Sequence, residues 1–376
     1  MYILMKVYLD NAASTQIDPN VWKVIQNAVK DYANPSSLHT MGKDARARIE
    51  NARKIIASKI NAQPYEIHFT SGGTEANNLA IRGIVARSKK KEIITSTIEH
   101  ASVIETCKEL ANKGYKSHFL PVDKKGIVDL TQLAKKISSK TALVSIMHAN
   151  NEVGTIQPIE KIARICAKHN VPFHTDAVQS FTKVPLNVKK IDIHALTLSG
   201  HKIHAPKGIG AMYVRKGTHI EHVTYGGHQE GNLRPGTENS LGIVGFGAAA
   251  SINQPVKKIQ SLRDYLIKEV LNNIPKTTLN GHKTKRLCNN VNISFEGIES
   301  ESLLLHLSLQ NIYVSIGAAC DSKDIEPSHV LTAMGISRKQ AYGTIRFTLS
   351  KYNNKKQIDY AIRKLKRIVT TLRKVQ

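Results

Sequence analysis

Hydrophobic residues recur along the chain at two spacings, and these predict its regular elements. Between Lys43 and Asn61 apolar residues return every three or four positions, as they do from Ile358 to Leu372, so both stretches are predicted amphipathic helices. From Ile191 to Leu198 apolar and polar residues alternate, which predicts a strand with one buried face. The segment Asn290-Val-Asn-Ile-Ser-Phe295 alternates in the same way and predicts a half-buried strand.

Strands and helices are predicted to follow one another regularly through the first two thirds of the chain. Such alternation favours a mostly parallel sheet flanked by helices. The pattern changes near Asn253-Gln-Pro255, where we place a domain boundary. Before it, strands are predicted over 7–10, 66–70, 92–97, 117–121, 141–148, 171–175, 191–198 and 211–214, with helices beginning near 20, 43, 79, 102, 129, 160 and 241.

Composition narrows the class of protein. The chain has 376 residues and four widely spaced cysteines without a C-x-x-C pair, so neither a disulfide framework nor a zinc site is expected. We therefore expect a reducing, cytoplasmic setting and no metal. No apolar run approaches the roughly 18 residues that cross a bilayer, and the first residues lack a signal-peptide pattern.

The formal net charge of +25 has two interpretations. It could attract RNA or an acidic protein, or it could reflect a surface solvated mainly by lysine. Direct binding of nucleic acid is not expected, because aromatic residues make up only 5% of the chain and none interleave with the charges as stacking platforms.

One segment places a lysine directly after a predicted strand. The strand that ends at Leu198 is followed by Ser199-Gly-His-Lys202 and then by a turn rich in Gly and Pro. Ligands of open α/β sheets bind just outside strand ends, and a desolvated lysine there can form a Schiff base with a carbonyl cofactor. Ser199 and His201 could hold a phosphate beside it. On this segment alone, Lys202 could equally be one of many surface lysines.

Polar groups gather at other predicted strand ends. The run Ser71-Gly-Gly-Thr-Glu75 joins a strand to a helix and predicts a phosphate cradle that includes Thr74, although it matches neither the P-loop nor the dinucleotide-binding spacing. His100, Asn151 and Asp176 lie at or just past strand ends. Singly each could be a satisfied polar group or a helix cap, but one rim of a parallel sheet would bring all of them together.

These groups match the needs of pyridoxal phosphate. The cofactor takes a lysine for its aldehyde, an anion for its ring nitrogen, an aromatic partner for its ring face and donors for its phosphate. The lysine would be Lys202, the anion Asp176 and the aromatic partner His100, and the cradle would supply the phosphate donors. Cys320, on a later glycine-flanked loop, adds a nucleophile.

At this point the chain resembles the cysteine desulfurases of the NifS/IscS type, within the fold type I (class V aminotransferase) pyridoxal enzymes. The resemblance runs almost end to end. It rests on Tyr8-Leu-Asp-Asn-Ala-Ala13, Asn34-Pro-Ser-Ser37, Phe69-Thr-Ser-Gly-Gly-Thr-Glu-Ala-Asn-Asn78, Glu99-His100, His148-Ala-Asn-Asn-Glu-Val-Gly154, His174-Thr-Asp-Ala-Val-Gln-Ser180, Ser199-Gly-His-Lys202, Arg234-Pro-Gly-Thr-Glu-Asn239, Ala319-Cys320 and Glu326-Pro-Ser-His-Val-Leu331.

The resemblance implies an architecture and an oligomeric state. It implies an α/β fold whose large domain, residues 13–252, holds a mostly parallel seven-stranded sheet flanked by helices. A smaller α+β domain would span 253–376, with the segment 1–12 packing on it. It also implies a homodimer in which Thr237 reaches the phosphate of the second subunit.

The resemblance further implies a role for each site residue. Lys202 would carry the cofactor and move the Cα proton of L-cysteine, and Cys320 would attack the substrate sulfur, leaving L-alanine and an enzyme persulfide. Asp176 would pair with the pyridine nitrogen, and His100 would stack on the ring and assist proton transfer. The remaining implied roles are Gln179 on the phenolic oxygen, Thr74, Ser199 and His201 on the phosphate, and Asn151 with Arg346 on the substrate carboxylate.

Several positions depart from the family pattern without removing a named group. Asp321 follows Cys320 where Ser or Thr is commoner, and its charge is expected to disfavour the thiolate. Pro235 replaces a usual serine, while His204-Ala205 and Ser350-Lys351 replace the usual aromatic-Gly and Gly-Arg.

Partners and alternatives follow from the same resemblance. The length of the loop after Cys320 indicates delivery of sulfur to an iron–sulfur scaffold protein, with a tRNA-thiolation enzyme as the other acceptor considered. Selenocysteine lysis or transamination on the same fold remains an alternative reaction. A cofactor-free RNA-binding protein is a third hypothesis, which would leave the Lys202, Asp176 and Cys320 constellation without a use.

Overall fold

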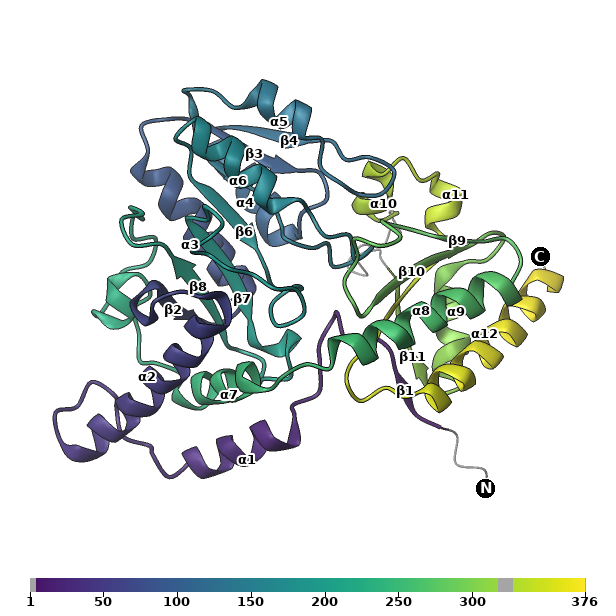
Figure 1. Cartoon of the computed structure of the whole chain (residues 1–376), viewed down its shortest axis with the longest axis horizontal. Helices are drawn as coiled ribbons and strands as arrows, with labels where there is room; N and C mark the ends of the chain where they lie inside the picture. The colour runs from purple at the N-terminus through teal and green to yellow at the C-terminus, as the bar shows by residue number, and fades with distance from the viewer. Residues whose placement is uncertain (1–4, 317–326, 376) are drawn as a thin grey trace.

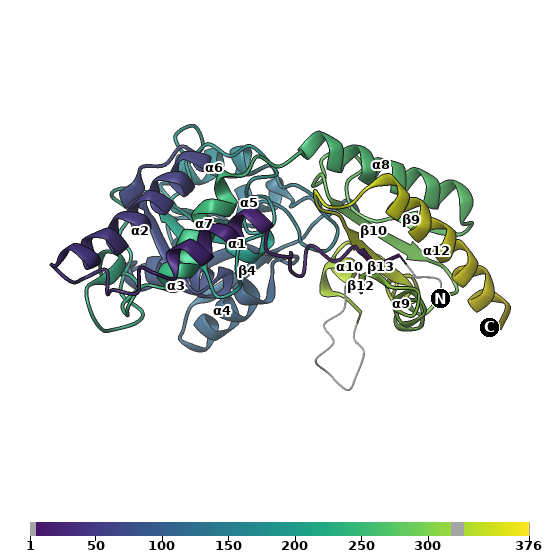
Figure 2. The same cartoon turned by 90° about the horizontal axis from the view of Figure 1, so that it is seen from below.

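The computed structural model describes residues 5–316 and 327–375. Two sheets lie toward opposite ends of the long axis of the molecule (Figure 1). The larger sheet lies among the helices of the first two thirds of the chain, and the smaller one lies among those of the last third. The view from below shows the same separation, with the chain crossing between the two parts at several points (Figure 2).

The larger sheet has seven strands and is mostly parallel, as predicted. Only β8 runs antiparallel to its neighbours, β2 and β7. In spatial order the strands are β2 (Ile67–Thr70), β8 (Gly210–Val214), β7 (Ala195–Ser199), β6 (Phe173–Asp176), β5 (Thr141–Ser145), β3 (Glu92–Ser96) and β4 (Lys116–Leu120).

Helices cover both faces of this sheet. One face packs on α1 (Pro19–Ala28), α2 (Thr40–Ile60), α5 (Leu130–Lys136), α6 (Ile159–Lys168) and α7 (Ser240–Ser251). The other packs on α3 (Gly73–Arg87) and α4 (Ala101–Asn112). Because both faces are covered, all five residues of β7 are buried. Short 3₁₀ turns complete this part at η1 (Pro64–Glu66), η2 (Gly200–Lys202) and η3 (Gln229–Asn232).

The smaller sheet is antiparallel and has its own core. Its order is β12 (Ser315–Ile316), β13 (Thr344–Thr348), β10 (Asn290–Phe295) and β9 (Thr277–Leu279). Its apolar residues pack on α8 (Val256–Asn273), α9 (Ser300–Ser308) and α12 (Lys355–Val375). Near it, β1 (Val7–Tyr8) pairs in parallel with β11 (Ile312–Tyr313). Two short helices, α10 (His329–Ala333) and α11 (Arg338–Ala341), lie beside it.

Three predictions about single elements are wrong in detail. The strand predicted over Ile191–Leu198 begins only at Ala195, and it is buried on both faces rather than one. β10 is likewise fully buried, because its polar residues meet polar partners instead of water. Asn280 Nδ2 donates to Asn292 Oδ1 and to Ser294 Oγ, both at 2.8 Å.

The third correction concerns the helix predicted to begin near Leu79. α3 begins at Gly73, so Thr74 and Asn77 lie in its first turns. The polar residues that suggest a loop therefore face a cavity. The cause is tertiary: Asn77 donates to two side chains, one on a neighbouring strand and one on a neighbouring helix.

Candidate active site

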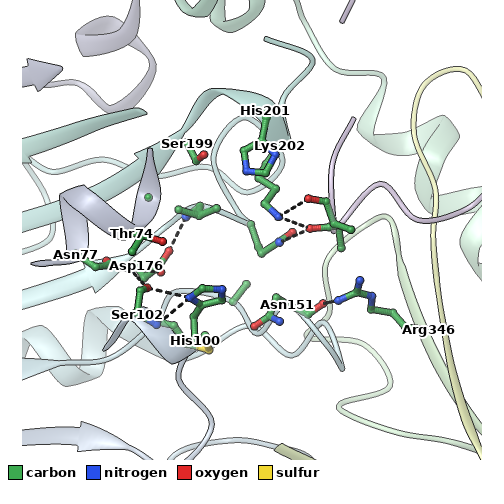
Figure 3. A pocket seen from close by; sticks show the side chains of 17 residues that line it. Thr74, Asn77, His100, Ser102, Asn151, Asp176, Ser199, His201, Lys202 and Arg346 are labelled. Carbon is green, nitrogen blue, oxygen red and sulfur yellow. Dashed lines mark hydrogen bonds between the residues drawn. The ribbon is translucent and has the colours of Figure 1, made fainter. Parts of the chain in front are cut away.

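A cavity of about 340 Å³ lies between the two sheets. Its walls come from the carboxyl ends of the parallel strands, as expected for an open α/β sheet, and from one strand of the smaller sheet. Every predicted site residue that the structure describes, except Thr237, lines it (Figure 3). These residues are Thr74, His100, Asn151, Asp176, Gln179, Ser199, His201, Lys202 and Arg346.

Lys202 ends the 3₁₀ turn η2, which directly follows β7. Its Nζ donates to the backbone oxygens of Ala12 at 2.6 Å and Ala13 at 2.8 Å. Burial, together with the cations Arg346 and Lys183, lowers the pKa of this amine to about 8 against the opposing carboxylates Asp10 and Asp176. An amine with that pKa has an appreciable neutral fraction near pH 7, which is the form that attacks a carbonyl.

Asp176 ends β6 and is buried. Its Oδ1 accepts from the backbone N–H of Val178 at 2.9 Å, and its Oδ2 accepts from Asn77 Nδ2 at 2.8 Å. Asn77 Nδ2 also donates to Ser102 Oγ at 2.9 Å. A hydrogen-bonded carboxylate therefore faces the cavity with a fixed orientation (Figure 3).

His100 caps the N-terminus of α4. Its Nδ1 accepts from the backbone N–H of Ser102 at 3.1 Å and lies 2.8 Å from Ser102 Oγ. Burial is the main cause that lowers the pKa of the imidazole; Asp176 opposes it, while Lys202 and His329 act in the same direction as burial. The ring is therefore neutral at pH 7, with Nε2 the protonated nitrogen because Nδ1 is an acceptor.

The end of the cavity beside the start of α3 suits a phosphate. The N-terminus of the 15-residue helix α3 opens there, with the exposed Thr74 in its first turn. A Cβ at Gly73 would lie 2.9 Å from Val178 Cγ2, so a larger residue here would require the Val178 side chain to move. Ser199 and His201 face the same end, and burial together with Lys202 and Lys207 lowers the pKa of His201 to about 4.

The smaller sheet contributes Arg346, which lies in the middle of β13. Its guanidinium donates to the backbone oxygen of Asn151 at 3.1 Å and to Asp10 Oδ1 at 2.9 Å. On the other wall, Gln179 Nε2 donates to the backbone oxygen of Ala12 at 3.0 Å. The chain before α1 thus passes between the two sheets and contacts both Gln179 and Lys202.

One predicted residue that the structure describes does not line the cavity, and another falls where the structure gives no description. Thr237 is exposed in the connection between η3 and α7 and does not line the cavity. Cys320 lies outside the described residues.

Two residues that the sequence analysis did not single out belong to the site. Asn77 and Ser102 join Asp176 to His100 through hydrogen bonds. A signal for Asn77 exists in the sequence. Once a helix begins at Gly73, Asn77 falls three positions after Thr74, on the same face. Ser102 has a weaker signal, since it is one of many serines near a helix start.

Comparisons with a family model, with related proteins and with a solved structure all indicate the same protein family. A family model described as aminotransferase class-V matches residues 7–361. A protein of Dictyoglomus turgidum named cysteine desulfurase IscS is 45% identical over 98% of this chain and 96% of its own length. A protein of the same name from Methanosarcina thermophila is 47% identical over 98% of this chain and 93% of its own length. A solved structure of a NifS-like protein superposes with a TM-score of 0.92 at 39% identity, covering 98% of this chain and all of the other.

Proposed function

Because the chain belongs to the class-V aminotransferase family, we propose that it is a pyridoxal-phosphate-dependent cysteine desulfurase, which converts L-cysteine to L-alanine and retains the sulfur as a persulfide on Cys320. The observation that carries the proposal is the convergence of Lys202, Asp176 and His100 on one cavity that ends at a helix N-terminus.

The residues present fit the cofactor. The cavity offers an amine of lowered pKa, an oriented carboxylate and a neutral imidazole, and glycine at position 73 allows close approach at the phosphate end. Asn77 Oδ1 is buried without a hydrogen-bond partner among the described residues, so a polar ligand group would satisfy it. When bound, pyridoxal phosphate supplies an aldehyde and a protonated ring that accepts electrons from the substrate.

The chain's own residues then have distinct tasks. Lys202 would bind the aldehyde and move the proton of the substrate Cα, because its amine is neutral at little cost near pH 7. Asp176 would favour a proton on the ring nitrogen through its charge. His100, neutral and held by Ser102, would face the ring and could exchange a proton through Nε2. The donors to the phosphate would be Thr74, Ser199 and His201, and Gln179 would donate to the phenolic oxygen.

Substrate orientation falls to Asn151 and Arg346. A guanidinium binds a carboxylate through two parallel hydrogen bonds, which fixes both position and angle. Arg346 is held by Asp10 on one side and by the backbone of Asn151 on the other, so its fork is oriented before substrate arrives.

The transfer of sulfur balances without an added oxidant. The Cys320 thiolate forms an S–S bond with the substrate sulfur as the substrate C–S bond breaks. The electron pair of that bond stays with carbon, which takes a proton and becomes the methyl group of L-alanine. The sulfur is oxidised and the carbon is reduced, and the enzyme retains Cys320–S–SH.

A substitution at Cys320 tests this function. Cys320→Ser should abolish alanine formation from L-cysteine while the protein still takes up pyridoxal phosphate and turns yellow, because the residues predicted to hold the cofactor are unchanged. Cys166→Ser, a buried thiol in α6, is the matched control and should keep its activity. Full activity in Cys320→Ser would disprove the mechanism. Rates with selenocysteine and with a keto acid distinguish lyase and aminotransferase activity.

We infer a homodimer as well. Four large apolar side chains are exposed from α1 to the start of α2: Trp22 (50%), Tyr32 (83%), Leu38 (87%) and Met41 (46%). Large apolar side chains grouped on one surface favour burial against a partner. The exposed Thr237 is free to reach a second subunit. Light scattering of the purified protein, with Leu38→Glu as the disruptive variant, measures this directly.

The sulfur acceptor and the setting are proposals too. Relatives named cysteine desulfurase IscS support donation of sulfur by this chain, and we propose an iron–sulfur scaffold protein, or else a tRNA-thiolation enzyme, as the acceptor. The described cysteines Cys107, Cys166 and Cys288 are free and buried, which supports a reducing cytoplasmic setting. In the described part of the chain, none of the helices has both the length and the apolar character that crossing a membrane requires.

A further inference from the structure

A second lysine lies behind the active site. Lys183 follows β6, in the same turn as Gln179, and does not line the cavity. Its Nζ donates to the backbone oxygen of Gln179 at 3.1 Å and to the backbone oxygen of Lys202 at 3.2 Å. One side chain therefore joins the turn after β6, which carries Asp176 and Gln179, to the turn after β7, which carries Lys202.

We propose that Lys183 is a positioning residue for Lys202, which fixes the backbone of the reactive lysine relative to Gln179 and through its charge favours the neutral form of the Lys202 amine. The inference rests on the proposed function, because it assigns to Lys183 an effect on the group that binds the cofactor.

The backbone on both sides of this bridge supports the positioning role. Thr182, immediately before Lys183, has a φ of 63°, and His204, two residues after Lys202, has a φ of 75°. Neither is glycine, and left-handed backbone at such residues costs about 1–3 kcal/mol each. Conformations of this kind persist only where surrounding contacts hold them. The two hydrogen bonds of Lys183 connect these two turns to each other.

The charge of Lys183 is not neutralised by a close partner. Among the ion pairs of the described residues none includes Lys183, and both of its hydrogen bonds are to backbone oxygens. Burial lowers the pKa of Lys183 to about 8, with Cys288 acting in the opposite direction. Lys183 therefore still carries its proton at pH 7, close to the backbone of Lys202.

Other charged groups face Lys202 as well. Arg346 on β13 acts in the same direction as Lys183, while Asp10 near β1 and Asp176 on β6 oppose them. His100 and His201, also nearby, are neutral at pH 7 because burial lowers the pKa of each. Lys183 differs from Arg346 and Asp176 in a useful way. It lies outside the cavity, so it can be changed without removing a group that touches cofactor or substrate.

The test measures the protonation of Lys202 in cofactor-free protein. Brief labelling with acetic anhydride at a series of pH values, followed by mass spectrometry of the Lys202 peptide, gives the midpoint at which this amine becomes reactive. The wild-type midpoint should lie near pH 8. Removing a neighbouring cation favours the protonated amine, so Lys183→Met should raise the midpoint by about half a unit. Lys183→Arg, which keeps the donors and stays fully charged near pH 8, should bring the midpoint back to the wild-type value or below it.

A second measurement follows cofactor uptake. A rise of half a unit reduces the neutral fraction of Lys202 at pH 7 about threefold. Uptake of pyridoxal phosphate by Lys183→Met, followed by absorbance, should slow by about that factor at pH 7 and recover at higher pH. Lys190→Met, an exposed lysine in the same connection, is the matched control and should leave both measurements unchanged.

The outcomes separate the possibilities. An unchanged midpoint in Lys183→Met, or an equal change in Lys183→Arg, would overturn the inference, and a purely structural role would lower thermal stability without moving the midpoint. If Lys183→Met does not fold, Lys183→Gln is a second neutral variant for which the same upward shift is expected. Failure of the wild-type protein to form alanine would overturn the proposed function, whereas the labelling result would still decide the role of Lys183.

Discussion

The two walls of the cavity hold their polar groups in different ways. On the larger sheet Asp176, Ser199, His201 and Lys202 lie at or beyond the ends of strands. On the smaller sheet Arg346 lies within β13, paired in register with Asn292 and Ser315. The first wall is built from turns, and the second from a regular strand.

Because of this difference, the two walls destabilise the fold in different ways. In the turns the cost lies in the backbone, as the left-handed Thr182 and His204 show. In the strand the backbone is regular, and the cost is a buried guanidinium that must find partners. Arg346 finds them in Asp10 and the oxygen of Asn151. Substitutions on the turn wall should therefore affect chemistry or backbone strain, while those on the strand wall should affect substrate binding.

The largest effect is expected on the turn wall, from Asp176→Asn. The variant removes the charge beside the ring nitrogen but can keep the hydrogen bonds. In the variant, Oδ1 of residue 176 can still accept from the backbone N–H of Val178. Asn77 can rotate its amide so that its own Oδ1, which has no partner among the described residues, accepts from the new amide at position 176. We expect alanine formation to fall on the order of 10²–10³-fold.

Thermal unfolding distinguishes loss of charge from loss of fold. Asp176→Asn should melt slightly below the wild-type temperature. Both hydrogen bonds of residue 176 can be replaced, but the rotated Asn77 amide no longer donates to Ser102 Oγ. Asp44→Asn, an exposed carboxylate on α2, is the matched control and should change neither activity nor melting. Wild-type turnover by Asp176→Asn would show that the carboxylate is a structural group and not part of the chemistry.

The two walls were also predictable from sequence to different degrees. The turn wall follows in part from local patterns. A strand that ends in Ser-Gly-His-Lys places Lys202 at the edge of the sheet, although that segment alone fits a surface lysine equally well. Arg346 depends on tertiary structure. The strand pattern locates β13, but nothing near it indicates a cavity, and only the resemblance to a known family pointed to this arginine.

The wrong predictions about α3 and β10 also arise because tertiary contacts are not visible in a local sequence pattern. α3 begins earlier than predicted. Asn77 and Asn78 resemble loop residues, but the burial of Asn77 is compensated by its hydrogen bonds to Asp176 and Ser102 on other elements. β10 was expected to be half exposed, but Asn290 and Asn292 donate to the backbone oxygen of Glu152 across the boundary between the sheets. Polar residues buried by distant partners cannot be recognised from spacing alone.

An intermediate effect is expected on the strand wall, from Arg346→Lys. Lysine keeps the charge but lacks the planar fork that binds a carboxylate through two hydrogen bonds. The KM for L-cysteine should rise about 10-fold to 100-fold, since a hydrogen bond to a charged group contributes about 1.5–3 kcal/mol. Binding lost equally from substrate and transition state leaves kcat nearly unchanged.

Steady-state kinetics across a range of L-cysteine concentrations checks this division. Arg367→Lys, an exposed arginine on α12, is the matched control and should keep the wild-type KM. A fall in kcat at unchanged KM would contradict the comparison, because it would place Arg346 with the groups that carry out the chemistry.

The smallest effect is expected from Thr182→Gly, which tests whether the turn wall stores strain. Thr182 is β-branched at a φ of 63°, and its Oγ1 is buried without a partner in the described part of the chain. Glycine removes a strain of about 1–3 kcal/mol but loses about 0.5–1 kcal/mol through the greater freedom of the unfolded chain. The free energy of unfolding should therefore rise by about 1 kcal/mol.

Asn170→Gly is the control. Asn170 has a similar φ of 51°, but asparagine tolerates left-handed backbone, so its gain in stability should be smaller. Denaturant unfolding of both variants measures the difference, and the labelling midpoint of Lys202 should stay at the wild-type value because Lys183 retains its charge. Equal stability changes in the two variants would show that the backbone at Thr182 carries no special strain, and the cost of the turn wall would then have to lie in its buried amines.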